Sequence, residues 1–265
     1  MVATPLVQLS DVSKRYGYGP VVLDHISLAA NPGDFISLIG PSGCGKSTLL
    51  KLIAGLSPLT DGNVLVSGRT PAEAAAELAF VFQEPTLLPW LTVGKNIDLP
   101  QKLRGVPVVD RMTTCRRVLE LVRLSDRREA FPRQLSGGQK MRVSIARALS
   151  LSPKLLLLDE PFGALDEMTR EHLNEELLAI RQQQAWTAFF VTHSVAEAVF
   201  LSNRIVILSA GPGRIHTEVA VPLAYPRTEA TRLSREYHSL VAEVSRLLRS
   251  VETAVPSDSR AMPSK

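Results

Sequence analysis

The sequence lacks any long apolar stretch. None of its 265 residues belongs to a run that approaches the roughly 18 to 20 uninterrupted apolar residues needed to cross a bilayer. The first residues, MVATPLVQLSDVSKRYG, also lack the charged and then apolar pattern of a secretion signal. We therefore expect a protein of the cytosol that has no membrane span of its own.

Cysteine is scarce as well. The two cysteines, Cys44 and Cys115, lie far apart in the sequence. Their spacing resembles neither a disulfide framework nor a set of metal ligands. Both are expected to be free thiols.

Aromatic residues make up only 5% of the chain, against 45% for hydrophobic residues as a whole. This aliphatic composition favours an α/β core over an aromatic-rich all-β core. The charge is close to balance, with 30 basic and 26 acidic residues and a net charge of +4. The basic residues alternate with acidic ones, and no aromatic-plus-basic module accompanies them, so we do not expect nucleic acid as a partner.

Short apolar runs bounded by turn residues predict a mostly parallel sheet. The run at 35–39 follows the turn Asn31-Pro32-Gly33-Asp34, and Gly40 ends it. Buried strands of parallel sheets have such continuous apolar runs, and helical patterns lie between several of them here. The predicted strands are 6–9, 21–28, 35–39, 78–82, 155–158, 188–192 and 205–208.

Helical patterns divide the chain further. A helix is predicted at 46–54, where Gly55 is placed to cap its end. Between 85 and 153 the pattern changes to helices without strands, for example 112–124 and 138–149, which indicates an inserted helical subdomain. The core of the α/β domain is then about 1–84 and 154–225 within a single domain of 1–254.

The end of the chain predicts one amphipathic helix, at about 228–250. Apolar residues recur there at intervals of three and four, and we expect them to pack against the body rather than bind a partner. Residues 255–265 are rich in Ser and Pro and are expected to be disordered. The apolar residues of the helix are Leu233, Tyr237, Leu240, Val241, Val244, Leu247 and Leu248.

A phosphate-binding loop is predicted between the strand 35–39 and the helix 46–54. Its residues fit the pattern G-x-x-x-x-G-K-[ST], in which glycines let backbone amides point at phosphate oxygens and the helix start adds a favourable dipole. Lys46 is expected to reach the β- and γ-phosphates of ATP, and the Ser47 hydroxyl to ligate Mg²⁺. An ordinary glycine-rich turn is disfavoured because Lys46 and Ser47 stand in register. The loop consists of Gly40, Pro41, Ser42, Gly43, Cys44, Gly45, Lys46, Ser47 and Thr48.

Two acids follow the apolar strand 155–158 directly. Asp159 is expected at the carboxyl edge of the sheet beside the phosphate loop, where ligands of open α/β sheets bind. It should hold Mg²⁺ through water, and Glu160 is the candidate to polarise the water that attacks ATP. His193 follows another predicted strand and should face the same edge, although a lone histidine is more often structural.

With Leu135-Ser136-Gly137-Gly138-Gln139-Lys140, which stands about twenty residues ahead of Asp159, the chain resembles the ATP-binding cassette (ABC) family. The resemblance covers roughly residues 6–220. It includes the two nucleotide motifs, Tyr16, Gln83, the segment 164–166 and His193, in the order of the family. It implies a P-loop NTPase (RecA-like) core with a mostly parallel sheet, an N-terminal antiparallel β subdomain and an inserted helical subdomain.

The resemblance also implies roles for single residues. Tyr16 would stack on adenine, although Tyr18 leaves the choice of ring open. Gln83 resembles the residue that senses Mg²⁺ and the attacking water. Four further residues would act across a head-to-tail dimer that shares two ATP molecules. Ser136, Gly138 and Gln139 would bind the γ-phosphate of ATP held by the other copy. Asp166 would be part of the contact between the copies.

Three segments, 82–93, 161–166 and 211–215, are similar to the cassettes that drive uptake of sulfonates, taurine and nitrate. In that group the segment after Gln83 helps to receive a short helix of the membrane subunit. Leu87, Leu88 and Trp90 are therefore expected to form an apolar docking patch, with packing into the local core as the alternative for Trp90.

The resulting hypothesis is an importer ATPase at the cytoplasmic face of the bacterial inner membrane. Its partners would be a second copy of itself, transmembrane permease subunits and, indirectly, a solute-binding protein. Aliphatic sulfonates are the first choice of solute, with taurine, nitrate, and pyrimidine or other vitamin precursors as alternatives. No large domain follows residue 220, so the regulatory extension of sugar importers is expected to be absent. A soluble cassette protein acting on nucleic acid or ribosomes, and a small-molecule P-loop kinase, remain as other classes.

Overall fold

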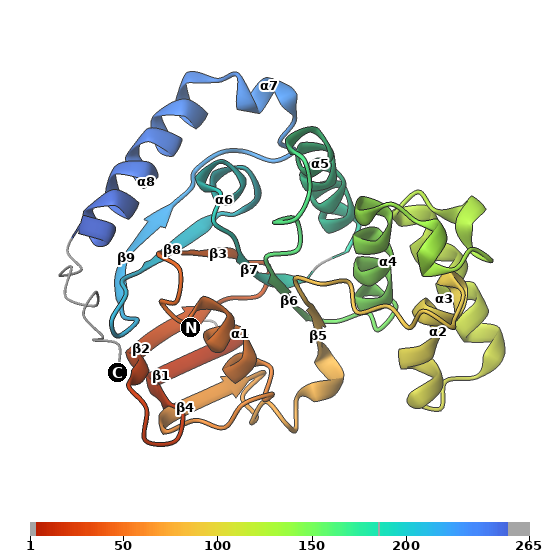
Figure 1. The fold of residues 1–265 in the computed structure, drawn as a ribbon, viewed down its shortest axis with the longest axis horizontal. Helices are drawn as coiled ribbons and strands as arrows, with labels where there is room; N and C mark the ends of the chain where they lie inside the picture. Colours follow the sequence, from red (N-terminus) through yellow and green to blue (C-terminus); the bar gives the residue numbers. More distant parts are fainter. Residues whose placement is uncertain (1–3, 185, 254–265) are drawn as a thin grey trace, which may run out of the picture.

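The structure is a computed structural model that describes residues 4–184 and 186–253. Its centre is a six-stranded sheet in the order β5-β6-β7-β3-β8-β9 (Figure 1). The first five strands of that order run parallel, and β9 pairs antiparallel with β8 at the edge. The strands are β3 (Phe35–Ile39), β5 (Leu78–Val81), β6 (Leu155–Asp159), β7 (Thr187–Val191), β8 (Arg204–Leu208) and β9 (Ile215–Ala220).

A second, antiparallel sheet of three strands lies beneath the first in the order β2-β1-β4 (Figure 1). Its strands are β1 (Val7–Arg15), β2 (Val21–Ala30) and β4 (Asp61–Val66). β1 continues well past the predicted end at Leu9, because the pairing register shifts between Leu9 and Val12 and the strand passes through a bulge there. The predicted mostly parallel sheet and N-terminal antiparallel subdomain are both present.

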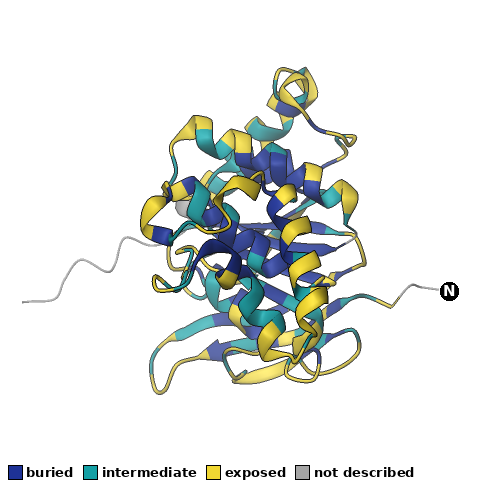
Figure 2. Cartoon of the chain, turned by 90° about the vertical axis from the view of Figure 1, so that its right-hand side faces the viewer, coloured by how far each residue is buried: buried dark blue, intermediate teal, exposed yellow. Residues whose placement is uncertain are grey.

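The two sheets and their helices are held by two apolar cores, one on each face of the parallel sheet. Alternate residues of a strand point to opposite faces, so Leu156 and Leu158 of β6 join one core while Leu155 and Leu157 join the other. Every residue of β3, β6 and β7 is buried. Figure 2 shows the buried residues in the interior of the layers, with exposed residues on the outer faces of the helices. The apolar runs in the sequence therefore correspond to strands covered on both faces.

Three helices lie between β5 and β6 in the chain and project to one side of the sheet (Figure 1). They are α2 (Val93–Leu103), α3 (Val108–Leu121) and α4 (Gly137–Leu149). Two short 3-10 helices, Ser125–Arg127 and Pro132–Gln134, lie between α3 and α4, and a third, Ala75–Glu77, precedes β5. The other helices of the core are α1 (Lys46–Ile53), α5 (Glu167–Gln183) and α6 (Val195–Leu201).

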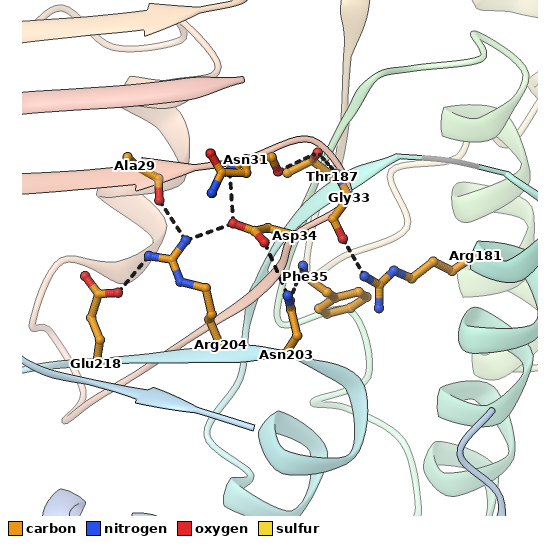
Figure 3. Close-up of polar contacts among 10 residues, drawn as sticks. All are labelled: Ala29, Asn31, Gly33, Asp34, Phe35, Arg181, Thr187, Asn203, Arg204 and Glu218. Atoms are coloured by element: carbon orange, nitrogen blue, oxygen red, sulfur yellow. Dashed lines mark hydrogen bonds and ion pairs between the residues drawn. The ribbon is translucent and has the colours of Figure 1, made fainter. Parts of the chain in front are cut away.

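A polar network joins the two sheets at the end where β3 and β8 begin. Arg204 donates to the carbonyl of Ala29 on β2 (2.8 Å) and forms ion pairs with Asp34 (2.8 Å) and Glu218 (2.7 Å) (Figure 3). Asn203 accepts a hydrogen bond from the amide of Phe35 (2.6 Å). The network lies at the amino end of these parallel strands and leaves their carboxyl ends free for a site.

The C-terminal part differs from the single helix predicted at 228–250. Two helices form, α7 (Glu229–Arg232) and α8 (Arg235–Thr253), and Leu233 between them is 75% exposed. The break arises because the Ser234 hydroxyl accepts from the amide of Tyr237 (3.2 Å) and starts a new helix. Including Leu233 in the buried face was therefore wrong.

The rest of that apolar face does pack against the body. Tyr237, Val244 and Val251 are buried in the same core as α6. Residues 255–265, which the sequence predicts to be disordered, lie outside the described residues. Among the helices of 4–184 and 186–253, none has both the length and the apolar composition that crossing a bilayer requires.

Candidate nucleotide-binding site

The predicted phosphate loop lies at the carboxyl edge of the parallel sheet, directly after β3. It turns into α1 at Gly45, whose φ of +97° is in the left-handed region. A Cβ at this position would lie 2.5 Å from Leu23 Cδ2, so a larger residue would be both strained and crowded. No side chain caps the start of α1, which leaves its first amides free for an anion.

Lys46 is folded back into the loop. The residue is 5% exposed, and its Nζ donates to the carbonyls of Gly40 (2.9 Å) and Pro41 (3.0 Å). The ammonium is thus held at the centre of the curled backbone. Its third contact, with Cys44 Sγ (3.9 Å), is weak, so a phosphate oxygen can replace it.

Ser47 and Asp159 meet although 112 positions separate them. The Ser47 hydroxyl donates to Asp159 Oδ1 (2.7 Å), because α1 starts beside the end of β6. Burial raises the pKa of the Asp159 carboxyl, and the neighbouring Glu160 charge acts in the same direction. A cation at this point would relieve both effects.

This pair suits Mg²⁺. Hydroxyl and carboxylate oxygens are the ligands that Mg²⁺ prefers, and the ion commonly takes one or two of them while phosphates and water fill the other positions. Within the described residues, no group of three or more His, Cys, Asp and Glu side chains is placed to hold a metal alone. A site of two protein ligands completed by a nucleotide agrees with both observations.

Glu160 lies between two side chains from other strand ends. His193 Nε2 is 2.8 Å from its Oε1, and Gln83 Nε2 donates to its Oε2 (3.4 Å). Glu160 has a φ of +46°, a conformation that such a side chain rarely adopts and that costs about 1–3 kcal/mol. Its amide donates to the carbonyl of Val191 (3.0 Å), which holds this backbone in place.

Several predicted residues share one pocket of about 220 Å³. Its lining joins the phosphate loop to the acidic edge of the sheet. The structure therefore brings together residues that the sequence places more than 100 positions apart. The lining residues are Val22, Ser42, Gly43, Gly45, Lys46, Ser47, Thr48, Glu160 and His193.

Tyr16 lies at the end of the phosphate loop. A hydrogen bond to the Thr48 side chain lowers the pKa of the Tyr16 hydroxyl, and Lys14 Nζ lies 4.6 Å from the centre of its ring. Tyr16 is 50% exposed, whereas Tyr18 is fully exposed. Of the two rings that the sequence leaves open, that of Tyr16 is the more buried and lies beside Thr48 of the loop.

The other predicted residues form a separate surface. Ser136 begins α4, where its hydroxyl accepts from the Gln139 amide (3.3 Å) and the Gln139 side chain accepts from the Ser136 amide (3.0 Å). Asp166 caps α5 in a similar way, through Thr169. A pocket of about 380 Å³ includes Ser136, Gly138 and Gln139, and it shares no lining residue with the phosphate-loop pocket.

Sequence reasoning did not find two charged residues close to Glu160. Arg170 and Glu197 line a pocket of about 280 Å³ together with Gln83, Glu160 and His193. The only signal for Glu197 is its position three residues after Ser194, which is typical of a capped helix start. Cys44 and Cys115 are free, as predicted, and both are buried.

Known proteins are similar to this chain over most of its length. The family profile described as ABC transporter matches residues 23–163. The aliphatic sulfonates import ATP-binding protein SsuB of a Bacillus cereus strain is 45% identical over 240 residues, which are 89% of this chain and 94% of the relative. The protein of the same name from Bacillus subtilis (strain 168) is 49% identical over 210 residues, 79% of this chain and 81% of the relative.

Solved structures agree. The ATP-binding cassette MJ0796, in a dimeric post-hydrolysis state bound to ADP and Pi, has a TM-score of 0.73 and 32% identity, and covers 82% of this chain and 100% of its own. This likeness confirms the predicted α/β fold with a P-loop NTPase core. Because the profile matches more than half of the chain and these relatives match most of it, the chain belongs to the ABC transporter family, as one of its ATP-hydrolysing cassettes.

Proposed function

We propose that this cassette hydrolyses ATP to drive import of aliphatic sulfonates. The observation that carries the catalytic part is the position of Glu160, which lies next to the Ser47–Asp159 pair and is held by Gln83 and His193. The solute rests on the printed names of the relatives from two Bacillus species. Taurine, nitrate and vitamin precursors remain the alternatives.

Each side chain of the site has a role in this proposal. Lys46 binds the β- and γ-phosphates, and Tyr16 stacks on adenine. Ser47 and Asp159 would hold Mg²⁺, and Gln83 would sense it. The ion would neutralise charge on the phosphates.

Glu160 orients and polarises the attacking water. Its carboxylate accepts from His193 and Gln83, and neither of these two partners carries a permanent charge, so the contacts fix the carboxylate and leave its negative charge in place. His193 remains 49% exposed in its side chain and is free to contact the γ-phosphate. The site therefore has a base and an orienting group at the same edge.

We propose that the second surface completes the site of another copy in a head-to-tail dimer. Ser136 and Asp166 are exposed, and the pocket that Ser136 lines is separate from the phosphate-loop pocket of the same chain. The Ser136 hydroxyl accepts from the Gln139 amide and keeps its own proton to donate, and a helix start suits an anion such as the γ-phosphate. The dimeric state of the similar cassette MJ0796 supports this arrangement.

The docking surface for permease subunits is proposed at Leu87, Leu88 and Trp90. Trp90 is 69% exposed, which argues against the alternative that it fills the local core. Leu87 packs partly against the main core and would anchor the patch. The proposed position of the protein is peripheral, at the cytoplasmic side of a membrane.

We also propose a division of the chain into a core, a helical subdomain at 85–153 and a C-terminal helical part. The docking surface then lies at the start of the helical subdomain.

Glu160→Gln tests the catalytic proposal. The amide keeps the shape but cannot accept a proton, so we expect ATP binding to persist while steady-state turnover falls about 10³-fold. With ATP and Mg²⁺ the variant should accumulate as a dimer in size-exclusion chromatography. Glu243→Gln, an exposed acid of α8, is the matched control and should turn over normally. Normal hydrolysis by Glu160→Gln would reject Glu160 as the base.

The solute is tested separately. The cassette would be reconstituted in vesicles with the permease subunits and solute-binding protein encoded beside it. We expect an alkanesulfonate to stimulate ATP hydrolysis more than taurine or nitrate at equal concentration. Stimulation by nitrate alone would reject the sulfonate assignment and leave the catalytic proposal intact.

A further inference from the structure

Glu197 is a buried carboxylate in α6 that takes no direct part in the proposed chemistry. Its side chain is 7% exposed, and burial raises its pKa. The Thr192 hydroxyl donates to its Oε2, and Asn174 Nδ2 donates to its Oε1 (3.5 Å). A buried acid with this set of partners is fixed in position.

The contacts of Glu197 surround His193. Its carboxylate holds the Thr192 side chain, whose oxygen in turn accepts from the amide of Ser194 (2.9 Å). The amide of Glu197 donates to the Ser194 hydroxyl (3.2 Å). The residues before and after His193 are therefore both attached to Glu197, while the His193 ring itself contacts Glu160 (2.8 Å).

Arg170 of α5 lines the same pocket and holds the loop that follows Glu160. Its Nη2 donates to the carbonyl of Leu165 (2.7 Å) and its Nε to that of Phe162 (3.3 Å). These carbonyls belong to the loop that connects Glu160 to Asp166. The Arg170 Nε also lies 4.0 Å from Glu197 Oε1.

We infer that Glu197 and Arg170 are a positioning pair, which holds the His193 segment against the loop 161–166. The inference rests on the proposed function, because that loop would contact the second copy and His193 would serve the ATP of its own chain. Dimer contact at Asp166 is then coupled to the position of His193 and Glu160. Neither residue of the pair touches the nucleotide.

The test compares kcat with nucleotide affinity. Glu197→Gln keeps a similar shape and an acceptor for Thr192 but removes the charge that faces Arg170. Misplacement of a catalytic group by about 1 Å lowers a rate about 10²-fold, so we expect kcat to fall about 10- to 100-fold. The Kd for a fluorescent ATP analogue should change less than about twofold, since the phosphate loop is untouched. If Glu197 only stabilised the fold, Glu197→Gln would lower Tm and leave the kcat of the folded protein unchanged, which would overturn the inference.

Arg170→Lys is the second variant, and it covers the case in which Glu197→Gln does not fold. Lysine keeps the positive charge, but its single nitrogen cannot occupy the positions of both Nε and Nη2 of Arg170, so kcat should fall with Kd unchanged. The double variant Arg170→Lys/Glu197→Gln should be no slower than the slower single variant, because the two act as a unit. Fully additive losses, or normal kcat in both single variants, would overturn the inference.

Glu171→Gln is the matched control. Glu171 neighbours Arg170 on α5 and pairs with Arg232 (3.7 Å), but it does not line the pocket. Its kcat should stay within about twofold of the wild type. A loss equal to that of Glu197→Gln would also overturn the inference, because any ion pair of α5 would then have the same effect.

A parallel measurement separates this inference from the proposed function. In the Glu160→Gln background, ATP-dependent dimerisation should require a higher ATP or protein concentration when Arg170→Lys is added. If Glu160→Gln alone forms no dimer, the two-copy proposal fails. If it forms the dimer and Arg170→Lys leaves that dimer unchanged, the coupling fails while the proposed function stands.

Discussion

Two helix starts in the described part of the chain, those of α1 and α4, suit a phosphate group, and they differ in how their amides are used. At the start of α1 no side chain makes a capping hydrogen bond, and Lys46 lies buried within the loop. At the start of α4 the side chains of Ser136 and Gln139 cap each other's amides, and Ser136 is exposed. The first site is prepared for a ligand of its own chain, whereas the second is already stable without one.

Their surroundings differ as well. The start of α1 faces Asp159, Glu160 and His193, so it has groups for a metal ion and for water. The pocket at α4 holds Arg142 and His172 in addition to the capping residues, and no carboxylate lines it. A chain with one catalytic anion site and one site without catalytic groups is suited to the proposed pairing, in which each copy supplies what the other lacks.

Lys46→Ala should have the largest effect, because it removes the buried charge of the phosphate loop at the start of α1. Removing a charged donor from a buried site loses about 1.5–3 kcal/mol of binding, which corresponds to roughly 10- to 100-fold in Kd. Turnover should fall further, because the lost charge also stabilises the transition state. Equilibrium binding of a fluorescent nucleotide measures the first effect and phosphate release the second.

Lys51→Ala is the control for that experiment. Lys51 lies on the same helix but is exposed and does not line the phosphate-loop pocket. Its nucleotide Kd should stay within about twofold of the wild type. An equal loss in both variants would mean that general positive charge near α1, rather than the Lys46 position, binds the phosphates.

Ser136→Arg should break the second site and leave the first intact. The larger side chain would fill the pocket at α4, so we expect nucleotide binding by the monomer to stay unchanged and turnover to fall about 100-fold, in the range seen when one oxyanion donor is removed. Ser125→Arg, an exposed serine of the same helical part, should turn over normally. Normal hydrolysis by Ser136→Arg would contradict the two-copy mechanism.

The sequence predicted the strands that contain an apolar run better than the strands that lack one. β3 and β6 are continuous apolar runs, and such runs are visible without knowledge of their neighbours. β4 starts with Asp61-Gly62-Asn63, and β9 mixes apolar with polar residues, so neither has an apolar run of four residues and neither was predicted. These two edge strands owe their structure to the strand beside them, which the sequence does not reveal.

The candidate site shows the same division. The phosphate loop and the acids after β6 are local patterns with a fixed spacing, and reasoning from the sequence found them. The contact of Gln83 and His193 with Glu160 joins three strand ends and depends on the strand order β5-β6-β7-β3. Arg170 and Glu197 were missed because a single charge in a helix start resembles an ordinary cap.

Gly213→Ala should have a smaller effect on nucleotide binding, because it would press on the backbone of the phosphate loop without changing a residue of the loop. A Cβ on Gly213 would lie 2.0 Å from the carbonyl oxygen of Cys44. Gly213 cannot easily withdraw, because its amide donates to Val22 (2.9 Å) and its carbonyl accepts from the amide of Asp24 (2.9 Å). The loop must shift instead, at a cost of about 1–3 kcal/mol, and we expect about a tenfold weaker nucleotide Kd.

Gly211→Asn is the matched control in the same β8–β9 connection. Gly211 has a φ of +66°, which asparagine tolerates, and an added Cβ would meet nothing within 4 Å. The Kd of this variant should equal that of the wild type. If it weakens nucleotide binding as much as Gly213→Ala does, the effect comes from the connection as a whole and not from the contact with Cys44.

Gln139→Ala should produce the smallest effect and sharpen the contrast between the two helix starts. The variant removes one half of the reciprocal cap at α4, which is worth about 1 kcal/mol. A domain of this size would then lose about 2–4 °C in Tm, measured by calorimetry without nucleotide. Gln182→Ala, at an exposed position of α5, should not change Tm by a comparable amount.

The nucleotide-induced shift in Tm compares the two helix starts directly. Because α1 has no side-chain cap, nucleotide should still raise the Tm of the Gln139→Ala monomer by as much as that of the wild-type monomer. A reduced nucleotide-induced shift in the variant monomer would mean that the start of α4 contributes to binding within a single chain, and the two sites would no longer be independent.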